Sequence, residues 1–315
     1  MKKAIISYST TNIGDEIQSL AVKQLIDNVD YYIDREKLHQ FKNNEPVKLI
    51  INGWYMGNPN NWPPSEDIIP LFISFHISHN ANTNKIFFSK ENISYFKKFE
   101  PIGCRDKQTK ELLESHGVKA YFSGCATLTY KNKFKKRNNK ILCADPLFNI
   151  YPYSYGKNIY KSLIPTTLHN DIEYIRHKRI DINQSNTERF NDAEELIKKY
   201  STAKLVITSR IHVALPCLAL GTPVIFLDAG YSSSNQRDRF DGLIDNMLVI
   251  NDSHFPFSNY YNPLHILARI LRLYKLISRP GVIDIDWNHP SENNTDKTSI
   301  LAEGIRKKIN DFINE

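Results

Sequence analysis

The segment Ser209-Arg210-Ile211-His212 combines two side chains suited to anion binding and proton transfer. It follows the apolar run Leu205–Thr208, which is typical of a buried strand. Arginine presents a planar fork to a carboxylate or phosphate, and histidine can move a proton near neutral pH. The segment therefore predicts a ligand site with Arg210 and His212 as catalytic residues and Ser209 as a binding residue. An ion pair for Arg210 and backbone contacts for His212 explain the same pattern about equally well.

Pro216 bears on how freely His212 could act. A proline inside a helix removes a backbone hydrogen bond, whereas in the first turn it is tolerated. A helix that began near Leu215 would leave His212 on a loop.

A second candidate lies between the first predicted strand and the first predicted helix, and it contains Asn12, Gly14 and Asp15. Glycine lets the backbone approach a ligand, and a helix N-terminus favours an anion. Asn12 or Asp15 could instead hold a sugar hydroxyl. One glycine is far short of a dinucleotide-binding motif, and a plain turn with Asp15 as the helix cap is at least as well supported.

Arg105 and His76 lie at the ends of two other predicted strands. Asp106 is expected to cap the helix that begins at Lys107. Arg105 could then either form an ion pair with Asp106 or bind a ligand. His76 and His79 are three residues apart, so on a strand they would point to opposite faces. No metal site is predicted, while His76 alone could reach a ligand.

Trp54 and Arg239 complete the candidate substrate-binding residues. Trp54 lies in Asn52-Gly53-Trp54-Tyr55 directly after a predicted strand, where an aromatic ring suits either a sugar platform or the core. Arg239 lies in a polar run after Ala229-Gly230-Tyr231 that could cover a cleft. A solvated loop is the better supported alternative for most side chains of that run.

Short apolar runs alternate with helical patterns, which is typical of an α/β fold with parallel sheets. Ligands of such sheets bind beyond the carboxyl ends of the strands, where all of these candidates lie. Strands are expected at 4–8, 47–52, 71–77, 102–105, 120–123, 141–144, 163–168, 204–209, 223–227 and 248–251, and helices at about 15–27, 107–116, 188–200, 210–220 and 298–312.

The length of 315 residues suits two domains of ordinary size. The polar, basic stretch KNKFKKRNNK (131–140) is interpreted as the connection between them. We expect an N-terminal Rossmann-like domain over 1–135 on the acceptor side and a C-terminal one over 136–290 on the donor side. Residues 291–315 are expected to form a helix that packs back on the first domain.

Composition narrows the class of protein further. The net charge is +7 (41 basic against 34 acidic residues), but the basic residues are dispersed, which argues against nucleic acid as a partner. Four scattered cysteines and no adequate leader or spanning segment predict a reduced, cytoplasmic protein. The stretch 264–277 suits a helix docked on the core; a helix lying on the inner face of a membrane is the alternative.

Taken together, these segments resemble the polysaccharide pyruvyl transferase family over almost the whole chain except 152–185. The order and spacing of the motifs carry the resemblance more than any one of them. They are Asn12-Ile13-Gly14-Asp15, Asn52-Gly53-Trp54-Tyr55, Cys104-Arg105-Asp106, and Ser209-Arg210-Ile211-His212 with its continuation 214–225.

The resemblance implies two Rossmann-like domains in a GT-B-like arrangement with a cleft between them. It also implies transfer of a pyruvyl group from phosphoenolpyruvate to a sugar of a polysaccharide or its lipid-linked precursor, giving a ketal and phosphate without a cofactor. The family's Arg-x-His pattern matches Arg210 and His212. The alternative is a nucleotide-sugar glycosyltransferase of the same architecture, with Asp228 or Asp241 as the nucleotide contact.

Overall fold

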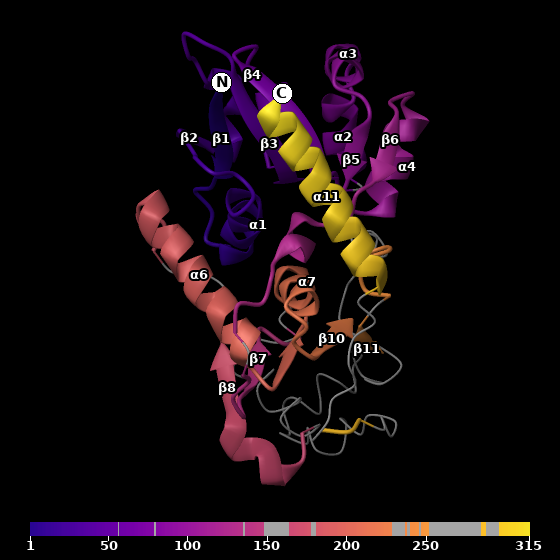
Figure 1. Ribbon diagram of the computed structural model, residues 1–315. Coiled ribbons are helices and arrows are strands. Elements are labelled where there is room, and N and C mark those ends of the chain that lie inside the picture. Colours follow the sequence, from indigo (N-terminus) through magenta and orange to yellow (C-terminus); the bar gives the residue numbers. More distant parts are fainter. Residues whose placement is uncertain are drawn as a thin grey trace.

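A computed structural model of the chain describes residues 1–55, 57–78, 80–134, 136–147, 164–177, 181–228, 237, 240–245, 247–251, 285–287 and 296–315. Within these residues lie two parallel sheets with helices packed on them (Figure 1). The predicted fold class is confirmed: the chain forms two Rossmann-like α/β domains, and a cavity lined from both domains lies between them.

The N-terminal sheet has the strand order β2-β1-β3-β4-β5-β6. Its central strand β3 is buried along nearly its whole length, as expected for a parallel sheet covered on both faces. The strands are β1 (Lys2–Ser7), β2 (Tyr31–Asp34), β3 (Val47–Trp54), β4 (Ile68–His76), β5 (Ile102–Cys104) and β6 (Ala120–Phe122).

The C-terminal sheet has the order β11-β10-β9-β7-β8, again with parallel pairing. Strands β7 and β9 are fully buried at its centre. The strands are β7 (Ile141–Ala144), β8 (Ile172–Ile175), β9 (Leu205–Thr208), β10 (Val224–Asp228) and β11 (Leu248–Asn251).

The helices of the described residues are α1 (Ile13–Lys23), α2 (Ala81–Phe87), α3 (Lys90–Lys98), α4 (Lys107–Ser115), α6 (Asn186–Thr202), α7 (Ile211–Ala219) and α11 (Asp296–Asn314). Short 3-10 helices are η1 (Arg35–Gln40), η2 (Pro59–Asn61), η3 (Ala126–Thr129) and η4 (Thr166–Asp171).

Two local expectations were wrong. In the predicted strand at 163–168, residues 166–168 belong to the 3-10 helix η4, and the strand β8 follows it. Because β8 is an edge strand with one fully buried residue, it lacks the apolar run that marks a central strand. Asp15 does not cap α1 either: Asn12 is the cap, and its Oδ1 accepts a hydrogen bond from the Gly14 N–H at 3.2 Å.

Helix α7 begins at Ile211, so His212 lies in its first turn and Pro216 lies inside the helix. Proline normally ends a helix because it has no N–H to donate. Here nearly every residue of α7 is buried, and this apolar packing outweighs the lost hydrogen bond. The helix expected at 210–220 is therefore confirmed, and the alternative of a start near Leu215 with His212 on a loop is not met.

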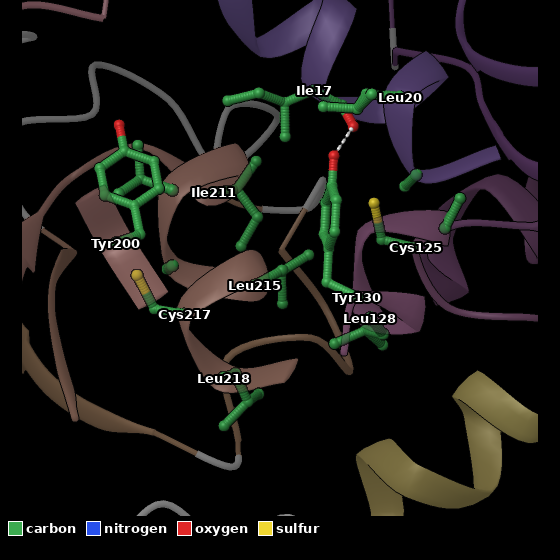
Figure 2. Packing of buried hydrophobic residues seen from close by; sticks show 14 of the residues in the cluster. Ile17, Leu20, Cys125, Leu128, Tyr130, Tyr200, Ile211, Leu215, Cys217 and Leu218 are labelled. Atoms are coloured by element: carbon green, nitrogen blue, oxygen red, sulfur yellow. Dashed lines mark hydrogen bonds between the residues drawn. The ribbon is translucent and has the colours of Figure 1, made fainter. Parts of the chain in front are cut away.

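One hydrophobic cluster runs through both domains and holds them together (Figure 2). Tyr130, which follows η3, packs between α1 and α7 and donates a hydrogen bond from its hydroxyl to the Ile17 carbonyl at 2.8 Å. Ile211 and Leu215 of α7 belong to the same cluster.

Helix α11 runs from the C-terminal half up along the N-terminal sheet (Figure 1). Ile305 and Ile309 on its inner face are buried. The Lys48 ammonium donates to the Phe312 carbonyl at 2.6 Å near the end of the helix. The last helix therefore binds the N-terminal domain by apolar packing and by the hydrogen bond from Lys48 to one carbonyl group at the end of the helix.

A buried ion pair also crosses between the domains. Arg189 of α6 is 2% exposed and Glu16 of α1 is 1% exposed. The Arg189 Nε donates to Glu16 Oε1 at 2.7 Å, and the Arg189 Nη2 donates to the same oxygen and to the Thr10 carbonyl at 2.8 Å. The pair thus secures the chain segment that leads into Asn12 and Gly14.

Candidate active site

Arg210 and His212 are positioned by the junction of β9 and α7. The Arg210 N–H donates to the Thr208 hydroxyl at 2.9 Å, and Arg210 occupies the position before the first helical residue. The Ser209 hydroxyl accepts a hydrogen bond from the Leu147 N–H at 2.8 Å. The short turn between strand and helix therefore places both predicted catalytic side chains at the carboxyl end of the sheet.

Asp145 fixes the guanidinium of Arg210. It directly follows β7 and has a φ of 40°, a left-handed conformation that is uncommon outside glycine. One of its carboxylate oxygens, Oδ2, accepts from the Arg210 Nε at 3.1 Å and from the Nη2 at 2.9 Å. The same oxygen accepts from the His177 N–H at 3.2 Å. Asp145 therefore ties the ends of β7, β8 and β9 together.

His177 lies just beyond β8 and is 1% exposed. Burial, with a smaller contribution from the charge of Arg210, lowers the pKa of its imidazole to about 3. The ring is therefore neutral at physiological pH. It can donate or accept a hydrogen bond there, but it cannot act as a proton donor in the charged form.

The N-terminal domain meets this site through the loop before α1. A Cβ atom added to Gly14 would lie 3.1 Å from the His212 Nδ1 and 3.2 Å from its Cβ. Such contacts are tighter than ordinary van der Waals packing. The absence of a side chain at Gly14 thus allows His212 of the opposite domain to approach the backbone of α1.

Arg105 enters from the end of β5 and is 3% exposed. Its Nε lies 3.6 Å from Asp106 Oδ2, and that oxygen also lies 2.7 Å from the His76 Nδ1. Asp106 caps α4 through hydrogen bonds from the Thr109 N–H and hydroxyl, as the sequence predicted. Burial alone would raise the pKa of Asp106, but His76, Arg105 and the Thr109 N–H together hold that pKa below its ordinary value.

These elements enclose a cavity of about 80 Å³ that is lined from both domains. This is roughly the space of two or three water molecules, enough for one anionic group. Its lining consists of Asn12 and Arg105 from the N-terminal domain and His177, Arg210, Ile211 and His212 from the C-terminal domain.

Other candidate residues lie close by in the fold but serve other contacts. Asp15 accepts a hydrogen bond from the Thr10 hydroxyl at 2.9 Å and lies 3.5 Å from the Arg35 Nη1. The Arg35 guanidinium lies over the face of the Trp54 ring, with its Cζ 5.6 Å from the ring centroid. His76 faces Asp106, and Arg239 lies outside the described residues.

Both carboxylates considered for a nucleotide contact are engaged in ion pairs. Asp228 Oδ1 accepts from the Arg237 Nε at 3.2 Å. Asp241 lies 3.6 Å from the Lys107 Nζ, with both side chains about half exposed. No cluster of three or more histidine, cysteine or acidic side chains suited to a metal ion occurs among the described residues.

Sequence reasoning missed Asp145 and His177. Asp145 directly follows a strand that the apolar pattern located correctly, so the rule that ligands bind at strand ends could have found it. His177 was missed because β8 was placed several residues too early, which put its end in the wrong position.

The fold and the site together define an anion-binding site in a two-domain α/β protein: two Rossmann-like domains line a small cavity with two guanidinium groups and two imidazole rings. The family model for polysaccharide pyruvyl transferase matches residues 12–231, which include both sides of the cavity. The chain belongs to the polysaccharide pyruvyl transferase family and is accordingly a transferase.

No curated protein matches the chain in sequence. Among solved structures, an uncharacterized protein from Klebsiella pneumoniae is similar with a TM-score of 0.43 and 14% identity, covering 78% of this chain and 92% of that one. S. aureus MnaA, solved with UDP, has a TM-score of 0.43 and 12% identity over 100% of this chain and 97% of its own.

The Methanocaldococcus jannaschii UDP-GlcNAc 2-epimerase, solved with UDP-GlcNAc and UDP, also has a TM-score of 0.43, with 13% identity over 98% of this chain and 99% of its own. Likenesses at this level do not assign a substrate to the chain. Separately, none of the helices in the described ranges combines the length and the hydropathy needed to span a membrane.

Proposed function

We propose that this chain transfers a pyruvyl group from phosphoenolpyruvate to two hydroxyls of a sugar, forming a ketal and releasing phosphate. Family membership supplies the reaction class. The observation that carries the assignment to this site is the interdomain cavity, which Arg105 and Arg210 line together with His212. Phosphoenolpyruvate carries a carboxylate and a phosphate, and guanidinium groups bind both kinds of anion through charge-assisted hydrogen bonds.

In the proposed mechanism His212 acts as the general acid. It transfers a proton to the methylene carbon C3 of phosphoenolpyruvate, and positive charge develops at C2. One sugar hydroxyl attacks C2 and loses its proton to His212, which restores the acid. A second hydroxyl then forms its bond to C2 as the C2–O bond to phosphate breaks, and its proton leaves with the phosphate.

Arg210 has the task of holding the donor anion while this charge moves. Its guanidinium is fixed at 2.9 and 3.1 Å by Asp145, so it does not have to reorganise during the reaction. Arg105 is held in the opposite wall and is almost fully buried. A charged group that is buried to this degree interacts more strongly with an anion than it would in water.

The acceptor enters, in this proposal, from the N-terminal domain. Asn12 lines the cavity, and Asp15 and Trp54, which both contact Arg35, belong to the same carboxyl end of the N-terminal sheet. Amide and carboxylate groups bind sugar hydroxyls, and an aromatic ring packs against a sugar face. A lipid-linked saccharide at the inner face of the membrane fits this proposal.

We place the reaction in the cytoplasm. The four cysteines (Cys104, Cys125, Cys143 and Cys217) are buried free thiols, as is usual for proteins of a reducing compartment.

The test is phosphate release from phosphoenolpyruvate in the presence of a panel of saccharide acceptors. We expect His212→Ala and Arg210→Ala each to reduce turnover by roughly 100-fold or more. His116→Ala is the matched control, because this histidine stacks on Phe88 and does not line the cavity. Unchanged turnover in both site variants would contradict the assignment.

A thermal-shift comparison separates the proposal from the glycosyltransferase alternative. Phosphoenolpyruvate is expected to raise Tm, and a panel of nucleotide sugars is expected to leave it unchanged. The reverse result would overturn the proposed donor.

A further inference from the structure

His177 is a buried residue of the cavity for which the proposed mechanism has no task. It lies in the cavity wall together with Arg105, Arg210 and His212. None of the described residues offers its Nε2 a hydrogen-bond partner, although that atom is inaccessible to solvent. A buried polar atom without a partner costs free energy, so its presence in a cavity wall indicates that a ligand supplies the partner.

The position of His177 is closely defined by the same carboxylate that holds Arg210. The His177 N–H donates to Asp145 Oδ2 at 3.2 Å, and the Arg210 Nη2 donates to that oxygen at 2.9 Å. On the side of α6, the imidazole packs against the Tyr200 ring at a centroid distance of 6.3 Å. One carboxylate therefore holds both the His177 backbone and the Arg210 guanidinium, and the imidazole lies beside Tyr200.

The charged and titratable groups around His177 favour a neutral donor. Arg210 and His212 lie on the β9–α7 side, Arg105 on the N-terminal side, Asp145 on β7 and Tyr200 on α6. Burial together with the charge of Arg210 lowers the pKa of His177 to about 3. A neutral imidazole carries one N–H, which can donate to an anionic oxygen without adding a further positive charge to the cavity.

We propose that His177 binds an anionic oxygen of the donor, in its phosphate or its carboxylate, through a neutral Nε2–H group, with Asp145 as the positioning residue for both His177 and Arg210. This inference rests on the proposed function for the identity of the donor, but not for the presence of an anion. It assigns distinct tasks to the two histidines of the cavity: His212 transfers the proton, and His177 only donates a hydrogen bond.

The first experiment is ¹⁵N NMR of the histidine side chains of the full-length protein, assigned with His177→Gln. We expect His177 to remain neutral between pH 5 and pH 8 and to carry its proton on Nε2 once an anion is bound. Inorganic phosphate and pyruvate are the two probes, because they carry the two anionic groups of the donor separately. A shift of the Nε2 signal with either probe supports the proposal and tells which group is bound.

A His177 ring that titrates near pH 6.5, or an Nε2 signal that neither probe moves at saturation, would overturn the proposal. Because these measurements need no turnover, they separate it from the proposed function. If His177 responds to phosphate while phosphoenolpyruvate is not consumed, the proposed function fails and the anion site stands.

The second experiment compares variants by phosphate affinity and by steady-state kinetics. His177→Ala is expected to weaken phosphate binding by roughly 10- to 100-fold, the range for a hydrogen bond to a charged group. His177→Gln keeps an N–H donor and should recover part of that loss, while the pH dependence of kcat stays that of the wild type. His116→Gln is the control. Affinity of wild-type strength in His177→Ala, with the fold confirmed by circular dichroism, would contradict the proposal.

Discussion

Gly14 of the N-terminal domain is in contact with His212 of the C-terminal domain, and the contact leaves no room for a side chain. A Cβ at Gly14 would lie 3.1 Å from the His212 Nδ1. The two residues are almost 200 positions apart in sequence, and they meet only because the carboxyl ends of the two sheets face one cavity. The relative placement of the domains therefore sets the position of the proposed general acid.

Gly14→Ala is expected to lower kcat by about 10-fold or more. The new methyl group would displace His212 by a few tenths of an ångström, and small misplacements of a reacting group are costly for rate. Because alanine favours the helix, Tm should stay within a few degrees of the wild type. Phosphate release and thermal unfolding check both expectations.

Gly304→Ala in α11 is the matched control for this substitution. Nothing lies within 4 Å of the position where its Cβ would be. We expect unchanged kcat and a gain of up to about 1 kcal/mol in the free energy of unfolding. An active Gly14→Ala enzyme with wild-type kinetics would show that the contact does not restrain His212.

Arg189→Met is expected to destabilise the protein by about 3–5 kcal/mol, because it leaves the Glu16 carboxylate buried without its guanidinium. The double variant Arg189→Met Glu16→Met should recover much of that loss, since no charge then remains uncompensated. Urea unfolding of the two variants measures the difference. A double variant that is less stable than Arg189→Met would contradict this expectation.

Asp15 and Asp106 are expected to affect stability with opposite signs. Burial raises the pKa of Asp15, and Arg35 and the Thr10 hydroxyl offset only part of this effect. The folded protein therefore holds the Asp15 proton more tightly than the unfolded chain does, so the stability cost begins above the unfolded pKa of about 4 and is complete above the folded pKa. We expect Asp15→Asn to be as stable as the wild type or more stable at pH 7, with the difference vanishing in acid.

Asp106 has a folded pKa below its unfolded value of about 4. Its contribution to stability is present above the unfolded pKa and is lost as the pH falls through the folded pKa. Asp106→Asn should therefore destabilise the protein at pH 7 and progressively less below about pH 4. Urea unfolding of both variants as a function of pH checks the two signs. The same sign for both variants at pH 7 would refute the charge argument.

Ile309→Ala tests whether α11 stabilises the N-terminal domain. Ile309 is fully buried, so its truncation is expected to cost about 2–5 kcal/mol. Ile300 lies on the same helix with 74% exposure, and Ile300→Ala should change the free energy of unfolding by less than about 0.5 kcal/mol. Similar losses in the two variants would mean that the helix is not docked by its apolar face.

The sequence by itself determined the fold class and the location of most central strands, because buried parallel strands are continuous apolar runs that propensity and burial both favour. It also placed Arg210, Arg105 and Asn12 at or just after strand ends, because the end of an apolar run can be located from the order of residues along the chain. The position of the edge strand β8 was not predicted correctly, because its half-buried residues do not form a continuous apolar run. The expected helix at 210–220 is α7, and its buried packing accommodates Pro216 inside the helix.

Only the tertiary structure decided which strand-end residues share a cavity. His76 and Arg105 both follow strands of the same sheet, yet His76 faces Asp106 while Arg105 lines the cavity. The contacts of His177 and Asp145 with Arg210 depend on the order β9-β7-β8, which brings three segments together across the sheet. Strand order and domain packing are set by long-range burial, and a pattern read along one chain does not contain those distances.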